Sequence, residues 1–206
     1  MGQLGTSASG AVGVSFGFMS VIQAFGFMYG QGGGSIISRM LGRKDAKSAS
    51  TIASTSFFIS IFTGLLISIL GFLFFEPMIY ALGSSDTIFP YASDYLIYIL
   101  VAAPFMMASF SLNNILRFEG KAALAMIGLL TGAFLNIAGD PILIFVFDMG
   151  IAGAGLATAI SQIVSFCILL SIFVLGKTET KISIKKITRK WGDLFLQRGN
   201  RYFQFE

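Results

Sequence analysis

Five long apolar segments constrain the fold of this chain more than any other feature of its sequence. An α-helix needs about 20 apolar residues to cross the hydrocarbon core of a bilayer. Only 12% of the residues are charged and 55% are hydrophobic, whereas soluble domains carry about 25% charged residues. The sequence therefore predicts an all-α integral membrane protein, a polytopic helical bundle. We expect membrane spans at about residues 11–38, 51–75, 91–116, 122–147 and 151–176.

The two ends of the chain differ from these spans. Residues 1–10 are small and uncharged, and we expect them to be the remnant of a truncated first helix. Residues 177–206 are expected to form a basic linker on the cytoplasmic side, either as a helix lying on the membrane surface or as a solvated tail. The stretch from Arg198 continues neither pattern. We therefore expect an atypical C-terminal tail and an artificial end of the chain.

The basic residues divide the loops into two classes. If successive loops lie on alternate sides of a membrane, all 14 Lys and Arg residues fall on one side. They are Arg39, Arg43, Lys44, Lys47, Arg117, Lys121 and every Lys and Arg after Gly176. Because cytoplasmic loops are enriched in Lys and Arg, this side is predicted to be cytoplasmic. The distribution predicts a multi-pass protein of the cell membrane, with the lipid bilayer rather than nucleic acid as its partner.

Several classes of chemistry are excluded by composition. The chain has no histidine, so imidazole metal sites and His-dependent nucleophilic catalysis are ruled out. The single cysteine, Cys167, lies in an apolar run and cannot form a disulfide framework. The glycines of residues 30–34 lack the Lys-Ser/Thr that follows a phosphate-binding loop. We therefore expect no enzymatic activity and no cofactor, and assign these glycines to close helix packing.

An acid, an amide and a proline interrupt the fourth span. An aspartate at the centre of a span costs at least about 2.5–3.5 kcal/mol, so Asp140 is a candidate functional residue. Asn136 lies four residues earlier and shares its helical face. Pro141 cannot donate a backbone hydrogen bond and so loosens the helix there. The alternatives are a simple hydrogen bond between helices, or an aspartate at the outer interface.

Four motifs then occur in a recognisable order. They are residues 30–45 (GQGGGSIISRMLGRKD), 116–120 (LRFEG, after Asn113 and Asn114), 136–141 (NIAGDP) and 150–158 (GIAGAGLAT). Together they resemble helices two to six of MATE (multidrug and toxic compound extrusion) transporters of the prokaryotic DinF-like branch. The resemblance covers about residues 4–191. It implies one incomplete six-helix lobe of a twelve-helix transporter, whose partner is a second lobe.

The resemblance also implies a function. MATE transporters expel cationic or amphipathic compounds in exchange for inward proton or sodium flow, so an ion gradient supplies the energy. Their site in this lobe matches Asp140 and Asn136, together with Asn114 or its neighbour Asn113, and Thr158. A sodium ion at Asp140 would suit the oxygen ligands, and the same carboxylate can hold a proton instead. The family site also uses a first-helix aspartate that has no counterpart in this chain.

Two other functions are also compatible with the sequence. One is a lipid-linked oligosaccharide flippase of the same superfamily, which would be expected to place more basic residues in its cavity. No Lys or Arg lies within an expected span here. The other is a membrane fragment that does not transport, which is consistent with the expected truncation. Substrate identity and the choice between proton and sodium do not follow from the sequence.

Overall fold

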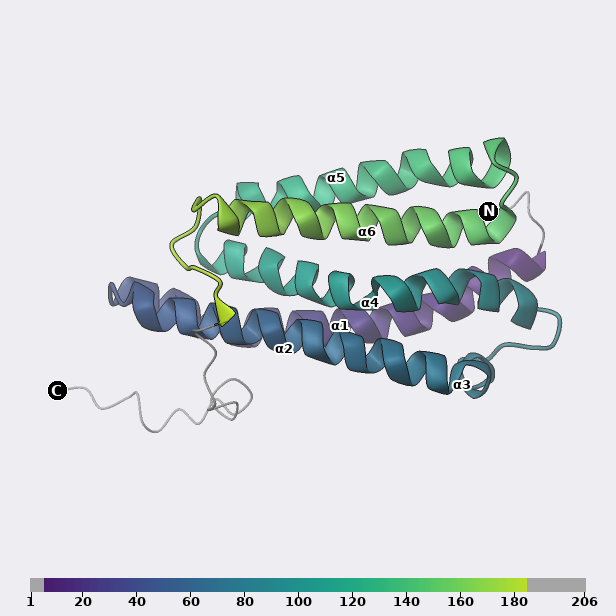
Figure 1. Cartoon of the computed structure of the whole chain (residues 1–206), viewed down its shortest axis with the longest axis horizontal. Helices are drawn as coiled ribbons and strands as arrows, with labels where there is room; N and C mark the ends of the chain where they lie inside the picture. Colours follow the sequence, from purple (N-terminus) through teal and green to yellow (C-terminus); the bar gives the residue numbers. More distant parts are fainter. Residues whose placement is uncertain (1–5, 185–206) are drawn as a thin grey trace.

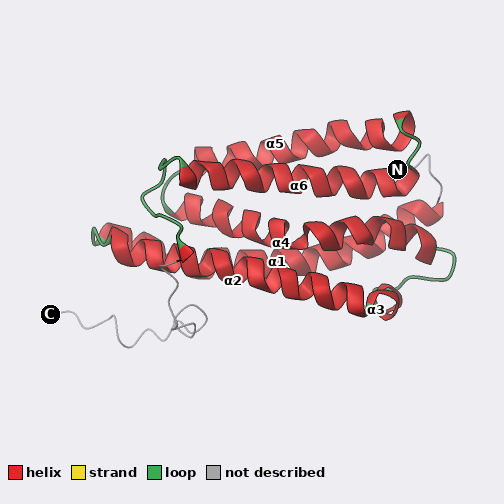
Figure 2. Cartoon of the chain, in the orientation of Figure 1, coloured by secondary structure: helices red, strands yellow, loops and turns green. Residues whose placement is uncertain are grey.

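The computed structural model describes residues 6–184, and within this range the regular structure is entirely helical (Figure 2). The elements are α1 (Thr6–Gly42), α2 (Ala46–Leu73), α3 (Phe75–Ala81), α4 (Phe89–Phe118), α5 (Ala122–Pro141), the π-helix η2 (Ile142–Val146) and α6 (Gly150–Val174). Five helices, counting α5 and η2 as one, are long and apolar enough to cross a membrane. The predicted all-α polytopic bundle is confirmed.

The observed helices extend beyond several of the predicted spans. α1 begins at Thr6, so residues 6–10 form its first turns. α2 begins at Ala46 because Asp45 caps it, with its carboxylate accepting a hydrogen bond from the backbone N–H of Ser48 at 3.0 Å. Hydrogen bonding to Ser48 also lowers the pKa of Asp45 below its ordinary value. Hydropathy did not predict where α1 and α2 begin, because their first turns consist largely of small and polar residues.

Two local features of the backbone involve prolines. The short helix α3 was not predicted, and it tolerates Pro77 because this residue lies in its first turn, where no intrahelical N–H is required. At the end of α5, Pro141 is followed directly by the π-helix η2, in which the N–H of Phe147 bonds to the carbonyl of Ile142 at 3.1 Å. The fourth span is therefore not one continuous α-helix, as expected from a proline at this position.

Helix α4 is the centre of the bundle. It packs against α1 and α2 on one side and against α5 and α6 on the other (Figure 1). In its most apolar stretch 72% of the residues are buried, compared with 11% for α5 with η2. The described chain thus forms two helix layers, α1–α2 and α5–α6, on either side of α4, with α5 at the edge.

Close packing of α1 on α4 depends on the glycines noted in the sequence. A Cβ atom at Gly30 would lie 2.7 Å from the Cβ of Asn114, and one at Gly34 would lie 2.1 Å from the ring of Phe118. Side chains at these positions would force the helices apart. The assignment of this glycine run to helix packing rather than phosphate binding agrees with these contacts.

Successive long helices run in opposite directions, so the loops gather at two ends of the bundle (Figure 1). The loops after α1 and α4 and residues 175–184 lie at one end, which we call the basic end. Residues 82–88 and 147–149 lie at the opposite end. Which end faces the cytoplasm stays a prediction. The expectations for residues 1–5 and 185–206 lie outside the described residues.

Candidate functional site

Asn136 connects the two helices that carry the candidate site. Its amide nitrogen donates to the carboxylate of Asp140 at 3.3 Å and to the hydroxyl oxygen of Thr158, on α6, at 3.1 Å. These two bonds use both hydrogens of the amide group. Thr158 in turn donates to the backbone carbonyl of Ala154 at 3.0 Å. Asp140, Asn136 and Thr158 therefore form one continuous hydrogen-bonded chain.

Tyr95 on α4 adds a further member to this cluster. Its hydroxyl lies 3.4 Å from the hydroxyl oxygen of Thr158 and 3.9 Å from the sulfur of Met19 on α1. The hydroxyl hydrogen of Tyr95 is directed to Met19 and that of Thr158 to the carbonyl of Ala154, so either hydroxyl can be the donor where the two meet. Both Tyr95 and Thr158 are buried. The cluster is thus held by α4, α5 and α6 and reaches α1.

Asp140 is half-buried and has spare hydrogen-bonding capacity. Among the described residues it accepts one hydrogen bond, from Asn136, and no basic side chain forms an ion pair with it. A carboxylate has about four lone-pair directions, so most remain free for a proton or a cation. The oxygens of Thr158 and of the Ala154 carbonyl, which continue the hydrogen-bonded chain beyond Asn136, are of the type that hard cations bind.

The two candidate asparagines of α4 have separate environments. The amide of Asn113 donates to the carbonyl of Ala125 on α5 at 2.8 Å, and Asn113 also lines the cavity described below. The amide of Asn114 donates to the carbonyl of Phe110 within its own helix at 2.8 Å, on the side that packs against Gly30. Asn114 therefore contributes to helix packing, and Asn113 is the one placed near Asn136.

A cavity of about 250 Å³ lies beside the polar cluster and is bounded by α1, α4, α5 and α6. Its wall combines large apolar side chains with a few polar groups. The apolar residues include Phe16, Met19, Phe110 and Leu129, and the polar ones include Tyr95, Asn136, Thr158 and Gln162. None of the described residues that line it is basic. Asp140 does not line the cavity but is one hydrogen bond away, through Asn136.

Tyr95 is the site residue that sequence reasoning missed. A tyrosine in an apolar span has no distinctive pattern, and its partner lies 63 residues away in the chain. The sequence did contain one signal, because Gly155 on α6 indicates a place where another helix can approach α6 closely. A Cβ atom at Gly155 would lie 2.9 Å from the carbonyl oxygen of Tyr95, so glycine allows α6 to approach α4 closely enough for this contact.

The sequence profile of the MatE family matches residues 1–142. The chain belongs to the MatE family. Its relatives include the multidrug export protein MepA of Staphylococcus haemolyticus (strain JCSC1435), 35% identical over 170 residues, covering 82% of this chain and 37% of the relative. MepA of Staphylococcus aureus (strain MRSA252) is 31% identical over 175 residues, covering 85% and 39% respectively. The family expected from the sequence motifs is confirmed.

Solved structures of MATE proteins have the same fold. A crystal structure of MATE in the bent conformation matches this chain with a TM-score of 0.87 and 28% identity, covering 93% of this chain and 43% of that protein. An outward-facing multidrug resistance MATE family transporter of the MOP superfamily matches with a TM-score of 0.86 and 29% identity, covering 94% and 43%. This MatE chain thus spans about two fifths of the length of its relatives.

Proposed function

We propose that this MatE chain forms part of a multidrug exporter that expels cationic or amphipathic compounds in exchange for protons or sodium ions. The observation that carries the proposal is the hydrogen-bonded chain from Asp140 through Asn136 to Thr158, of which Asn136 and Thr158 line a cavity between the helices. The name of the MepA relatives, multidrug export protein, supports the same function.

Asp140 is the proposed ion-coupling residue. A carboxylate within a membrane span is costly unless it is paired, protonated or bound to a cation. Here its protein partner is a neutral amide, so binding of a proton or a sodium ion would complete its interactions. Because Asn136 contacts both Asp140 and Thr158, a change in occupancy at Asp140 would alter the hydrogen bond that joins α5 to α6.

The cavity lining supports a cationic or amphipathic substrate. Aromatic and aliphatic side chains offer contacts to an apolar body, and aromatic faces attract cations. The described lining residues carry no positive charge that would recognise the phosphates of a lipid-linked oligosaccharide. We therefore favour drug export over the flippase alternative.

The proposed setting is the cell membrane, with the basic end of the bundle in the cytoplasm. The loops at that end carry Arg43, Lys44, Lys121 and Lys177, in line with the enrichment of Lys and Arg in cytoplasmic loops. Asp140 lies near the opposite end of α5, so with this orientation it would lie in the outer half of the membrane. An ion entering from outside would then reach it over a short path.

The test replaces Asp140 by asparagine. Asp140→Asn keeps the size of the side chain but removes the charge that changes with ion occupancy. The assay uses a chimera in which this chain replaces the matching part of the Staphylococcus haemolyticus MepA relative, and it measures efflux of a cationic dye from energised cells. We expect Asp140→Asn to reduce gradient-driven efflux to the level of cells without the transporter.

Asp148→Asn is the matched control. Asp148 undergoes the same chemical change in the loop that follows η2, outside the spans, and its φ of 54° is a conformation that asparagine tolerates. We expect normal efflux from this variant. Membrane insertion of Asp140→Asn should equal or exceed that of the wild type, since a charge costing about 2.5–3.5 kcal/mol is removed from the span. Undiminished efflux by Asp140→Asn would exclude Asp140 from coupling.

A further inference from the structure

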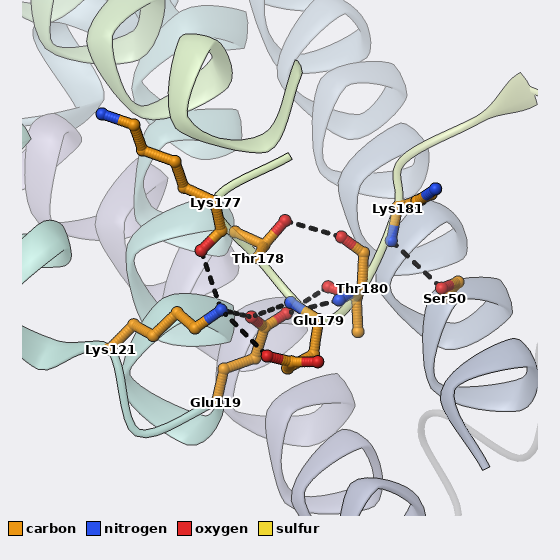
Figure 3. Close-up of polar contacts among 8 residues, drawn as sticks. All are labelled: Ser50, Glu119, Lys121, Lys177, Thr178, Glu179, Thr180 and Lys181. Carbon is orange, nitrogen blue, oxygen red and sulfur yellow. Dashed lines mark hydrogen bonds and ion pairs between the residues drawn. The ribbon is translucent and has the colours of Figure 1, made fainter. Parts of the chain in front are cut away.

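The segment after α6 crosses the basic end of the bundle and docks on α2. Residues 177–183, here called the strap, leave α6 beside the α4–α5 loop and continue to the first turns of α2 (Figure 3). The strap has no helical structure, so its backbone N–H groups need partners outside it. Four of them find side-chain acceptors on other elements.

Glu119 is the main anchor of the strap. Its side chain is completely buried, and its two carboxylate oxygens accept the backbone N–H of Glu179 at 3.0 Å and that of Thr180 at 3.2 Å. It also accepts the hydroxyl of Thr180, whose side chain is fully buried as well. Hydrogen bonds to an ionised acceptor are about twice as strong as neutral ones, so this carboxylate holds the middle of the strap firmly.

The far half of the strap is held by two serines of α2. The hydroxyl oxygen of Ser50 accepts the N–H of Lys181 at 3.0 Å, and that of Ser54 accepts the N–H of Ser183 at 3.0 Å. Ser54 also lies within donating distance of the carbonyl of Lys181, at 3.2 Å. Both serines are buried, which means that the strap covers this face of α2.

Lys121 closes the near side of the strap. Its ammonium group donates to the carbonyl of Lys177 at 2.7 Å and forms an ion pair with Glu179 at 3.3 Å (Figure 3). Glu119 and Lys121 both belong to the connection between α4 and α5. The strap therefore joins three places in the bundle, namely the end of α6, the α4–α5 connection and the start of α2.

We propose that Glu119 is the positioning residue of a clamp that ties the α5–α6 layer to α2 at the basic end of the bundle. The main contacts between the α1–α2 and α5–α6 layers otherwise run through α4. At the opposite end, residues 82–88 join the α2–α3 unit to α4 and residues 147–149 join η2 to α6, so neither connection bridges the two layers. The clamp holds the layers together at the basic end.

This arrangement has a mechanical consequence. A movement of α5 and α6 relative to α2 can open the end near Asp140 while the strap stays docked. Opening of the basic end, in contrast, must break the bonds of the strap either to Ser50 and Ser54 or to Glu119. The clamp is thus a releasable link whose docked state favours closure of the basic end. This inference concerns the bundle itself and does not depend on which compound or ion is transported.

Hydrogen–deuterium exchange of the purified 206-residue chain in detergent, read at single-residue resolution, tests the clamp. The amides of Glu179, Thr180, Lys181 and Ser183 are the reporters. Glu119→Gln keeps the side chain's shape but loses the charge, and we expect all four amides to exchange about tenfold faster or more, given the strength of hydrogen bonds to charged groups. Amides in the middle of α4 should keep their wild-type protection.

A second variant and a control complete the experiment. Ser54→Ala removes the hydrogen bonds of Ser54 that help to hold the strap on α2. It should also speed exchange of the amides of Glu179 and Thr180, which Ser54 does not contact. This variant provides the test if Glu119→Gln does not fold. Glu179→Gln removes only an exposed ion pair and should leave exchange nearly unchanged. Faster exchange confined to the amides next to each substitution, or no change in either variant, would overturn the clamp as a cooperative unit.

Discussion

The amide nitrogen of Asn136 lies 3.1 Å from the hydroxyl oxygen of Thr158, and this hydrogen bond joins the polar residues of α5 to α6. Hydrogen bonds between helices within membranes contribute only about 0.6 kcal/mol on average. The bond is therefore too weak to be a main source of stability for α5, which packs on α6 through Gly128 and Gly132. The role of this hydrogen bond is to fix the position of the Asn136 amide relative to Asp140.

Replacement of Thr158 tests this positional role. Thr158→Val keeps the shape of the side chain but removes the oxygen that accepts from Asn136 and lies 3.4 Å from the hydroxyl of Tyr95. We expect a small loss of thermal stability, on the order of 1 kcal/mol, and a much larger loss of ion-coupled dye efflux in the MepA chimera. The two effects are measured separately, by thermal unfolding of the purified protein and by transport in cells.

Thr158→Ser is the matched control for that experiment. Serine keeps the hydroxyl oxygen and loses one methyl group, so the hydrogen bonds with Asn136 and Ala154 can persist. We expect it to retain most of the efflux. Equal transport by the valine and serine variants would contradict a role for the Thr158 oxygen in the coupling site.

Most of the fold follows from the sequence because hydropathy and length determine membrane spans. All five predicted spans correspond to observed helices, and the alternation of loops with and without Lys or Arg matches the two ends of the bundle. The errors lie at the helix ends, where the signals are not apolar. Asp45 caps the start of α2 from within a polar loop, which hydropathy does not detect. Pro77 lies in the first turn of α3, but in the sequence a proline there indicates the end of a helix.

The site was predictable where its residues are close in the chain. Asn136 and Asp140 share a helical face at a spacing of four, and the structure places them in hydrogen-bond contact. Contacts between helices follow from packing, which sequence spacing does not encode. Asn113 and Asn114 could not be separated in advance, because one residue of rotation decides which of them faces the cavity.

The strap shows a further limit. Its charge pattern gave only a choice between a surface helix and a solvated tail, whereas its described residues pair with Glu119 and with α2. Those partners are about 60 and 130 residues distant in the chain. Local composition carries no information on such pairings, so they emerge only in the folded bundle.

Gly64 provides a prediction about packing. It faces the backbone of α4, where a Cβ atom would lie 2.6 Å from the Cα of Pro104. Because backbone atoms cannot move aside as a side-chain tip can, Gly64→Ala should force α2 away from α4. We expect a loss of stability of about 1–3 kcal/mol, typical of overpacking, measured as a lower unfolding temperature in detergent.

Gly17→Ala controls for the general effect of removing a glycine from a helix. Gly17 lies in α1, with nothing within 4 Å of the position its Cβ would take. Alanine favours helix formation over glycine, so we expect an unchanged or slightly higher unfolding temperature. A similar drop in both variants would mean that close contact with Pro104 is not the cause.

The final prediction concerns the orientation of the bundle in the cell membrane. Ser85 and Lys44 are exposed in loops at opposite ends, and among the described loops those at the end with Lys44 are the ones that carry Lys and Arg. Because basic loops favour the cytoplasmic side, a cysteine replacing Ser85 should react with a membrane-impermeant thiol reagent added to intact cells, whereas one replacing Lys44 should react only after the membrane is opened. Both variants are made with Cys167→Ser, which removes the native thiol. The reverse pattern would place the basic end outside and move Asp140 to the cytoplasmic half of the membrane, so the ion path proposed for it would have to begin on the other side.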